Sequence, residues 1–376
     1  MSSRYATVLG IVVLGCVAGN AAAQDIPPAP TPITPPSSPD LGRMPAPVTT
    51  GTSSSVSVWS TGCQLTPAGP DDLSADEPWE GHFVAGAGLY WIHPNFTNNP
   101  AYGEVRSRTV SGVPASVLSV QDFRYGMDFA PEVWLGYVTT SGLGVRVRWW
   151  QFDQGSGENL VNNGTLSLFS AAPVGLGVSS TTAGDVFKAY SDLKINLWDF
   201  EATQSVKAGC WELLFSGGGR YCFMSQDYWS SVVTAAGVRA STLQSGHIFN
   251  GGGPTAGFEA RRPFGAGLAF YSKARATLLF GNDHQEAFLN EFTGGTLTSI
   301  SDNSTNHLSV LPVAELELGA EYGYDLGQVR LVAQAGVVGQ AWFGAGNAAN
   351  ANSGLATDNS SNLGFIGMVF RAGVTY

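Results

Sequence analysis

The residues of this sequence best suited to acid–base chemistry are a few acids and histidines in polar stretches of its C-terminal half. They are His247, Asp283, His284, Glu286, Asp302 and His307. An aspartate beside a histidine can activate a water molecule, as a hydrolase requires. No serine–histidine–acid or metal-ligand spacing stands out, however, and five scattered histidines are typical of solvated side chains. We therefore predict that the chain is not an enzyme and binds no metal or cofactor.

A second group of reactive side chains alternates with apolar residues, as in the stretch GVRVRWW at 144–150. In a β-strand, successive side chains point to opposite faces, so Val145 and Val147 oppose Arg146 and Arg148. A soluble sandwich would bury the valines and leave the arginines in water. A membrane barrel would turn the valines to lipid and the arginines to a lumen.

The composition favours the barrel. Only 12% of the 376 residues are charged, against about 25% in a typical soluble domain, while 44% are hydrophobic. A formal net charge of −11 argues against nucleic-acid binding, which needs a basic face. Beyond the N-terminus, no stretch approaches the run of about 20 apolar residues that a membrane-spanning helix needs.

The N-terminal region has two parts that are not expected to belong to the fold. Residues 1–23 have a basic start, an apolar centre and a small-residue site at Ala21–Ala23, which predicts a secretory signal peptide. An alternative is lipidation of Cys16. Residues 24–78 begin with nine prolines between 25 and 47, which predicts a proline- and serine-rich linker.

The cysteines predict no disulfide framework. Removal of the signal leaves Cys63, Cys210 and Cys222, an odd number, so at least one thiol is unpaired. If residues 206–209 form a turn, Cys210 and Cys222 lie on one strand, twelve residues apart and too distant to bond. We predict two inert thiols that face the lumen.

From residue 79 to residue 376, ten apolar-alternating segments are separated by gaps that are strictly long and short in turn. The segments are 80–93, 129–139, 143–153, 188–205, 210–228, 247–260, 265–281, 307–324, 328–343 and 362–376. Tight periplasmic turns and long outer loops give this layout in outer-membrane barrels. It predicts an all-β, antiparallel transmembrane β-barrel of ten strands, or twelve if part of 154–187 forms another hairpin.

Aromatic residues fit the two interfacial girdles of such a barrel. The outward-running segments end in Trp91, Trp149-Trp150, Tyr228-Trp229, Phe280 and Trp342-Phe343, and the opposite rim has Tyr137, Trp211, Phe264, Tyr322 and Tyr324. The C-terminus, MVFRAGVTY, resembles the assembly signal of bacterial outer-membrane proteins. We therefore predict outer-membrane lipid and the barrel-assembly machinery as partners and the bacterial outer membrane as the location.

The charged residues on the faces opposite the apolar ones are predicted to line the lumen, because an arginine facing lipid near the midplane costs about 2–4 kcal/mol. They are Arg146, Arg148, Lys194, Arg220, Lys273, Arg275, Arg330, Arg371, Glu132, Glu212, Glu259, Glu315 and Glu317. These charges either impose a transverse field on passing solutes or pair with one another and fill the interior. The sequence does not decide between the two.

Four stretches carry a family resemblance. FVAGAGLYW (83–91), FAPEVWLGY (129–137), LKINLWDFEATQS (193–205) and WELLFSGGGRYCFM (211–224) resemble, in this order, the Legionella-type major outer membrane protein family. The resemblance implies a pore-forming outer-membrane barrel, although the proline-rich linker departs from the family. The predicted function is a porin-like channel for small solutes or ions. The alternatives are a non-conducting barrel that displays outer loops and anchors the proline-rich arm and, last, an outer-membrane hydrolase.

Overall fold

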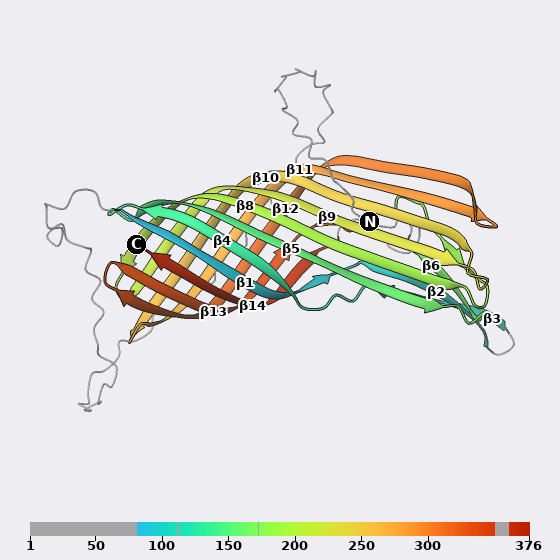
Figure 1. Cartoon of the computed structure of the whole chain (residues 1–376), viewed down its shortest axis with the longest axis horizontal. Helices are drawn as coiled ribbons and strands as arrows, with labels where there is room; N and C mark the ends of the chain where they lie inside the picture. Colours follow the sequence, from blue (N-terminus) through green and yellow to red (C-terminus); the bar gives the residue numbers. More distant parts are fainter. Residues whose placement is uncertain (1–80, 111–112, 172, 350–360) are drawn as a thin grey trace, which may run out of the picture. The chain divides into compact units, whose positions relative to one another are not determined.

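The computed structural model describes residues 81–110, 113–171, 173–349 and 361–376 (Figure 1). The predicted signal peptide, the lipidation alternative at Cys16, the linker and Cys63 lie outside these residues. None of the described residues belongs to a helix that is long and apolar enough to cross a membrane.

Ten antiparallel strands close into a barrel, as predicted. Around the ring the order is β1-β14-β13-β12-β11-β10-β9-β8-β5-β4. Each ring strand therefore pairs with the ring strands that precede and follow it in the sequence. The strands are β1 (His82–Phe96), β4 (Asp128–Val138), β5 (Leu143–Val161), β8 (Val186–Ala208), β9 (Trp211–Val233), β10 (Arg239–Gly265), β11 (Leu268–Thr293), β12 (Thr296–Leu326), β13 (Val329–Trp342) and β14 (Leu363–Thr375). The ring closes where β1 pairs with β14.

One end of the barrel carries the tight turns. Residues 209–210, 266–267 and 327–328 each connect two long strands. Gly209, Gly267 and Gly327 have φ values of 61°, 79° and 67°. Two-residue hairpin turns require positive φ because only this backbone twist matches that of the flanking strands, and glycine adopts it without strain. By the usual orientation of outer-membrane barrels, this end faces the periplasm.

The other end is more ordered than the sequence predicts. Residues 229–246 and 282–306, expected as long loops, mostly belong to β9–β12, which are 23–31 residues long. A membrane-spanning strand needs only about 9–11 residues. The strands therefore run well past the membrane and form an extension, defined by residues 150–161, 186–197, 222–233, 239–251, 281–293 and 296–309.

Two of the expected loops contain a second sheet. Its strands are β2 (Pro100–Val110), β3 (Val113–Asp122), β6 (Leu166–Ser170) and β7 (Ser179–Ser180), in the order β3-β2-β6-β7. The ring therefore has ten strands, and the alternative of twelve is wrong, since β6 and β7 join this sheet, which we call the cap. Tyr228 of β9 is buried and donates a 3.0 Å hydrogen bond to the carbonyl of Ala101, which holds the cap against the extension.

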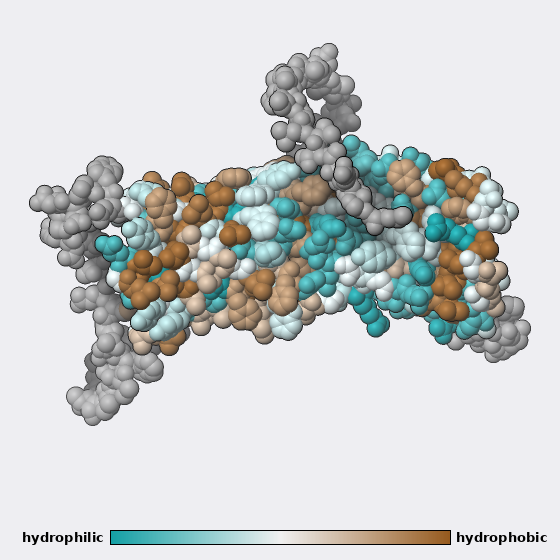
Figure 2. All heavy atoms as spheres, viewed as in Figure 1, coloured by the Kyte–Doolittle hydropathy of each residue, from teal (hydrophilic) through white to brown (hydrophobic). Residues whose placement is uncertain are grey.

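The outward faces of the ring are apolar, as a surface in contact with lipid must be. Val145 and Leu316, for example, are 61% and 54% exposed. Figure 2 shows apolar side chains over the half of the barrel nearest the short turns, with hydrophilic ones becoming frequent beyond it. Trp91, Phe280 and Phe343 point outward, as expected for a girdle.

The prediction is wrong for three girdle residues. Trp150, Tyr228 and Trp342 are at most 2% exposed and belong to the core. Each is adjacent in sequence to an aromatic residue that points the other way, and a strand sends only one of two consecutive side chains outward.

Candidate functional site: a charged network across the lumen

The network begins with two arginines of β5 that lie directly opposite two acids of β8. The strand register pairs Arg146 with Glu201 and Arg148 with Asp199. An Arg146 Nη atom lies 2.9 Å from Glu201 Oε2, and an Arg148 Nη atom lies 2.6 Å from Asp199 Oδ2. Cross-strand pairs of opposite charge on one face of a sheet stabilise the pairing of its strands.

Further ion pairs cross the lumen. Arg148 of β5 is 3.8 Å from Glu315 of β12, and these strands are five apart in the ring of ten, so they stand on opposite walls. Arg146 reaches Glu259 of β10 at 2.8 Å. Arg220 of β9 also bonds to Glu315. The charges of opposite walls therefore meet instead of facing an open pore.

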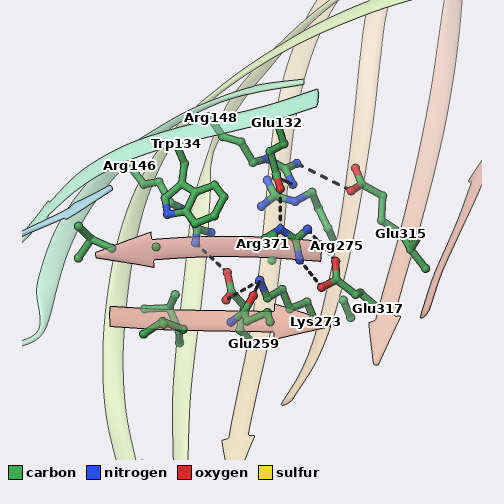
Figure 3. Close-up of a pocket in the computed structure, with 18 of the residues that line it drawn as sticks. Glu132, Trp134, Arg146, Arg148, Glu259, Lys273, Arg275, Glu315, Glu317 and Arg371 are labelled. Carbon is green, nitrogen blue, oxygen red and sulfur yellow. Dashed lines mark hydrogen bonds and ion pairs between the residues drawn. The ribbon is translucent and has the colours of Figure 1, made fainter. Parts of the chain in front are cut away.

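Arg371 of β14 connects the remaining walls. It bonds to Glu132 of β4 at 2.5 Å and to both carboxylate oxygens of Glu317 on β12, and it also donates to the Tyr90 hydroxyl (Figure 3). Arg275 of β11 bonds to Glu201. Figure 3 shows Glu132, Arg148, Arg275 and Arg371 converging on one region of the lumen.

The centre of the network is buried. The side chains of Arg220 and Glu201 are completely buried, and that of Asp199 is 1% exposed. The Asp199 carboxylate forms ion pairs with Arg148, Arg220 and Arg275. Buried charges are stable only when paired, and removing one partner leaves the other unpaired at a cost of about 3–5 kcal/mol.

Nearer the periplasmic end the charged side chains of the network are more exposed. Arg261 bonds to Glu212 at 2.5 Å and to Glu321 at 2.6 Å. The Lys273 ammonium donates to the Gln334 side chain at 3.0 Å, whereas its carboxylate neighbour Glu259 is 4.0 Å away.

A cavity of about 250 Å³ lies among these charges. Its wall includes Trp134, Lys273 and Arg371, and it extends to Val84 and Thr375, which are close to the periplasmic ends of β1 and β14 (Figure 3). A cavity of this size has room for several water molecules.

Aromatic side chains fill the lumen on the other side of the network. Trp150 stacks on Phe152 with ring centroids 6.4 Å apart, and Phe365 meets both rings edge to face. Tyr90 meets Trp150 in the same way. All four side chains are at most 2% exposed. The aromatic layer and the charged network follow one another along the lumen.

All predicted lining residues except Lys194 lie on the inward faces of their strands. Arg330 and Glu212 lie near the periplasmic rim, with side chains 41% and 44% exposed. The prediction for Lys194 is wrong. Its neighbours Leu193 and Ile195 are buried, while Lys194 points outward and pairs with Asp192 at 2.8 Å. Lys194 belongs to the extension, where the outer face meets water and a charge is not penalised.

The sequence analysis missed four members of the network: Asp199, Glu201, Arg261 and Glu321. A signal for the first two exists in the sequence. Asp199 and Glu201 alternate with Trp198 and Phe200, which are 41% and 55% exposed on the lipid side. If these aromatic residues are assigned to the lipid-facing side, strand alternation places both acids on the inward face and Lys194 on the outward face.

The acid–histidine group is brought together only in part. His247 Nε2 is 2.7 Å from Asp283 Oδ1, and His307 Nε2 is 3.7 Å from Asp283 Oδ2, so three adjacent strands contribute. His284 and Glu286 form a separate, half-exposed contact at 4.0 Å. Within the described ranges, no group of three or more His, Cys, Asp or Glu side chains is placed to hold a metal ion.

The prediction for the cysteines is also corrected. Cys210 lies in the turn between β8 and β9 and is disulfide-bonded, whereas Cys222 lies on β9 and is a buried free thiol.

Comparison with known proteins agrees with this architecture. The sequence profile described as the Legionella pneumophila major outer membrane protein precursor matches residues 77–375. The chain belongs to this family. Members of the Legionella major outer membrane protein family reside in the bacterial outer membrane, and the closed antiparallel barrel places this chain there too. No protein with a curated description matches it in sequence.

Solved structures similar to this family member are outer-membrane proteins of low identity. The outer membrane protease OmpT of Escherichia coli has 8% identity and a TM-score of 0.41 over 78% of this chain and 96% of its own. A deletion mutant of the monoaromatic hydrocarbon channel TodX has 8% identity and a TM-score of 0.25 over 80% and 91%. A Pseudomonas aeruginosa FadL homologue has 9% and 0.22 over 79% and 90%. At these scores, none of them informs the activity of this chain.

Proposed function

We propose that this protein is an outer-membrane barrel with a sealed lumen, whose function resides in the structure that it displays outside the cell. The observation that carries the proposal is the pairing of Arg148 with Glu315 across the full width of the ring. A barrel of eight strands is filled by its own side chains, and open porins have sixteen or more strands. Ten strands are close to the filled limit.

Two features support the assignment of function to the extension. The aromatic layer around Trp150 and Phe365 excludes water and polar solutes beyond the network. The cap and the extension also form an ordered surface well past the membrane, held by Tyr228 and by Tyr125, whose hydroxyl donates to Ser191 Oγ at 2.8 Å. Surface structures that carry function are commonly held on such rigid scaffolds.

A porin-like channel for small solutes or ions is the second candidate. The cavity beside Lys273 favours it, because the charged lumen is hollow toward the periplasm. In this case the cross-lumen pairs would act as a gate, and their acidic and basic groups would set the selectivity. The resemblance to a pore-forming family also supports it.

Single-channel recording on the refolded chain in a planar bilayer distinguishes the two functions. We expect the wild-type barrel to give no current steps, because the charged network and the aromatic layer would each block the passage of ions. Steady current steps that change in Arg146→Gln and Arg148→Gln, but not in the outward-facing control Lys194→Gln, would instead establish the channel. The folded state of each variant is checked first by its resistance to unfolding in detergent at room temperature.

We also propose that the barrel interacts with the barrel-assembly machinery and with lipid, and that it has no catalytic function. The last strand, β14, ends at Thr375 and turns Met368 and Phe370 outward, which suits recognition by the barrel-assembly machinery and then lipid. Among the described residues, the His247 ring bonds to Asp283 through Nε2 and its Nδ1 has no hydrogen-bond partner, so no described hydroxyl is positioned as a nucleophile and we propose no hydrolytic function. Hydrolysis of a peptide or lipid that is lost in His247→Ala would refute this.

A further inference from the structure

The β11–β12 hairpin has an edge that no described strand covers. β12 pairs with β11 from Thr296 onward, but with β13 only from Val313 to Leu326. The bond from the Phe343 amide to the Pro312 carbonyl is the last on that side. Residues 296–311 therefore present unpaired backbone groups along one edge within the described part of the chain. We call residues 286–293 and 296–311 the arm (Figure 1).

This edge has little of the usual protection against pairing, and the register irregularity in it lies near the tip, where Thr298 is an extra residue between Leu297 and Ser299. Natural edge strands are blocked by lysine, proline or bulges, because an open edge is a template for another strand. Residues 296–311 contain no lysine, arginine or proline, and their one acid is Asp302. Ile300 and Leu308 are 64% and 84% exposed on the same face of the strand. Such a strand is suited to accept another by strand addition.

The edge is complementary to itself. We propose that β12 of one copy pairs antiparallel with β12 of a second copy, with Ser304 opposite Ser304. In this register Ile300 of each copy lies directly opposite Leu308 of the other, which makes two apolar cross-strand pairs. Asp302 lies opposite Asn306, so no two like charges meet. A two-fold axis through Ser304 makes the interface closed, and the assembly stops at two copies.

The direction of pairing fixes how the two barrels are oriented. β12 is one continuous strand from the arm to the periplasmic rim, so antiparallel arms point their barrels in opposite directions. Two copies paired in this way lie in two membrane surfaces that face each other. The two Val310 residues are twelve residues apart along the paired strands, about 40 Å at 3.3 Å per residue. β9 runs twelve residues from Tyr221 to Val233, so the extension fits this gap.

The inferred contact deepens the proposed display function by naming its partner, a second copy of this chain. It depends on the barrel and the arm, not on whether the lumen conducts. A conducting bilayer and a failed pairing test are therefore separate results, and each refutes only its own proposal.

Disulfide trapping in the full-length protein tests the register. Ser304→Cys alone is expected to give a covalent dimer on mild oxidation, several-fold above the exposed control Asn250→Cys. Asp302→Cys and Asn306→Cys are expected to cross-link when mixed, whereas each alone stays at the control level. Equal trapping of all variants, or none above the control, would overturn the proposal.

Vesicles that contain the purified protein test the orientation. We expect wild-type vesicles to cluster, and clustering to be lost in Ile300→Lys and in Leu308→Lys but kept in Leu118→Lys, which charges an exposed leucine of the cap. Hydrogen exchange at high dilution provides a second measurement. Protection in the monomer of those amides of 297–311 that point away from β11 would mean that another part of the chain covers the edge, and this too would overturn the proposal.

Discussion

Asp199 is the residue on which the lumen network converges. Three arginines from β5, β9 and β11 reach its carboxylate, and its side chain is 1% exposed. The acid thus holds together three walls that are not all adjacent. Each of these arginines also has at least one other carboxylate partner, and Asp199 is the acid that all three share.

We expect Asp199→Asn to lower the free energy of unfolding by about 3–5 kcal/mol, since it leaves the buried Arg220 without its full counter-charge. Lys194→Gln, which removes an exposed outward charge of the same strand, should change it by no more than about 0.5 kcal/mol. Urea unfolding of the refolded barrel, followed by tryptophan fluorescence, measures both. Similar losses in the two variants would contradict the role of the network.

The contact between cap and extension contains buried tyrosines, of which Tyr125 lies in the segment between β3 and β4. Burial raises the pKa of Tyr125 to about 12, and hydrogen bonds to Ser191 and Asn99 oppose part of this rise. A folded-state pKa above the ordinary value of 10 means that the hydroxyl stabilises the fold fully below pH 10. This contribution is lost as the pH rises through 12.

Protease resistance of the cap is therefore expected to fall between pH 10 and pH 12. Burial also raises the pKa of Tyr228, which contributes in the same direction. Tyr125→Phe should weaken the cap by about 1 kcal/mol at pH 8, because it loses the bond to Ser191. It should also reduce the loss at alkaline pH. An unchanged alkaline loss in this variant would exclude Tyr125 as a source.

At the scale of elements, β9 contains three consecutive glycines with different surroundings. A Cβ atom on Gly218 would lie 1.9 Å from the backbone carbonyl oxygen of Phe200 on β8, which is too close for any side chain. A Cβ atom on Gly217 or Gly219 would meet nothing within 4 Å. Gly218 therefore allows β8 and β9 to approach each other beside the network, whereas its neighbours face outward.

Gly218→Ala should push β8 away from β9 and reduce the yield of folded barrel, with a cost of about 1–3 kcal/mol or more. Gly217→Ala and Gly219→Ala are matched controls on the same strand and should fold normally. The fraction of protein that keeps its compact mobility in unheated gel samples measures this. Equal yields for all three variants would mean that the close approach is unimportant.

In the whole molecule, each long strand passes through two environments, the lipid of the membrane and the water outside it. Between the girdles, lipid demands apolar outer faces, and the charges gather in the lumen. In the extension, water surrounds the outer face, so Lys194 and Asp192 can point outward there. The same strands thus have a lumen of paired charges in the membrane and a polar surface above it, which is the basis of the proposed display function.

The sequence by itself determined the ten ring strands and their lipid-facing sides. A charge in the lipid band is costly, so the period-two alternation is strict there, and residues such as Arg146, Arg275 and Glu317 could be placed inward correctly. Polar stretches such as 282–306 gave no such signal, because their outer face meets water and even buried inward positions such as Asp283 and Gln285 are polar, so the stretch resembles a loop.

Only the tertiary structure decided which charges meet. Arg148 and Glu315 lie far apart in the chain and become neighbours because ten strands close the ring at a diameter that two side chains can span. Closure also turned Trp150 and Trp342 from expected girdle residues into lumen filling. Alternation along a strand fixes the side on which a residue lies, but the opposite wall, and with it the pairing of charges across the lumen, exists only once the barrel has closed.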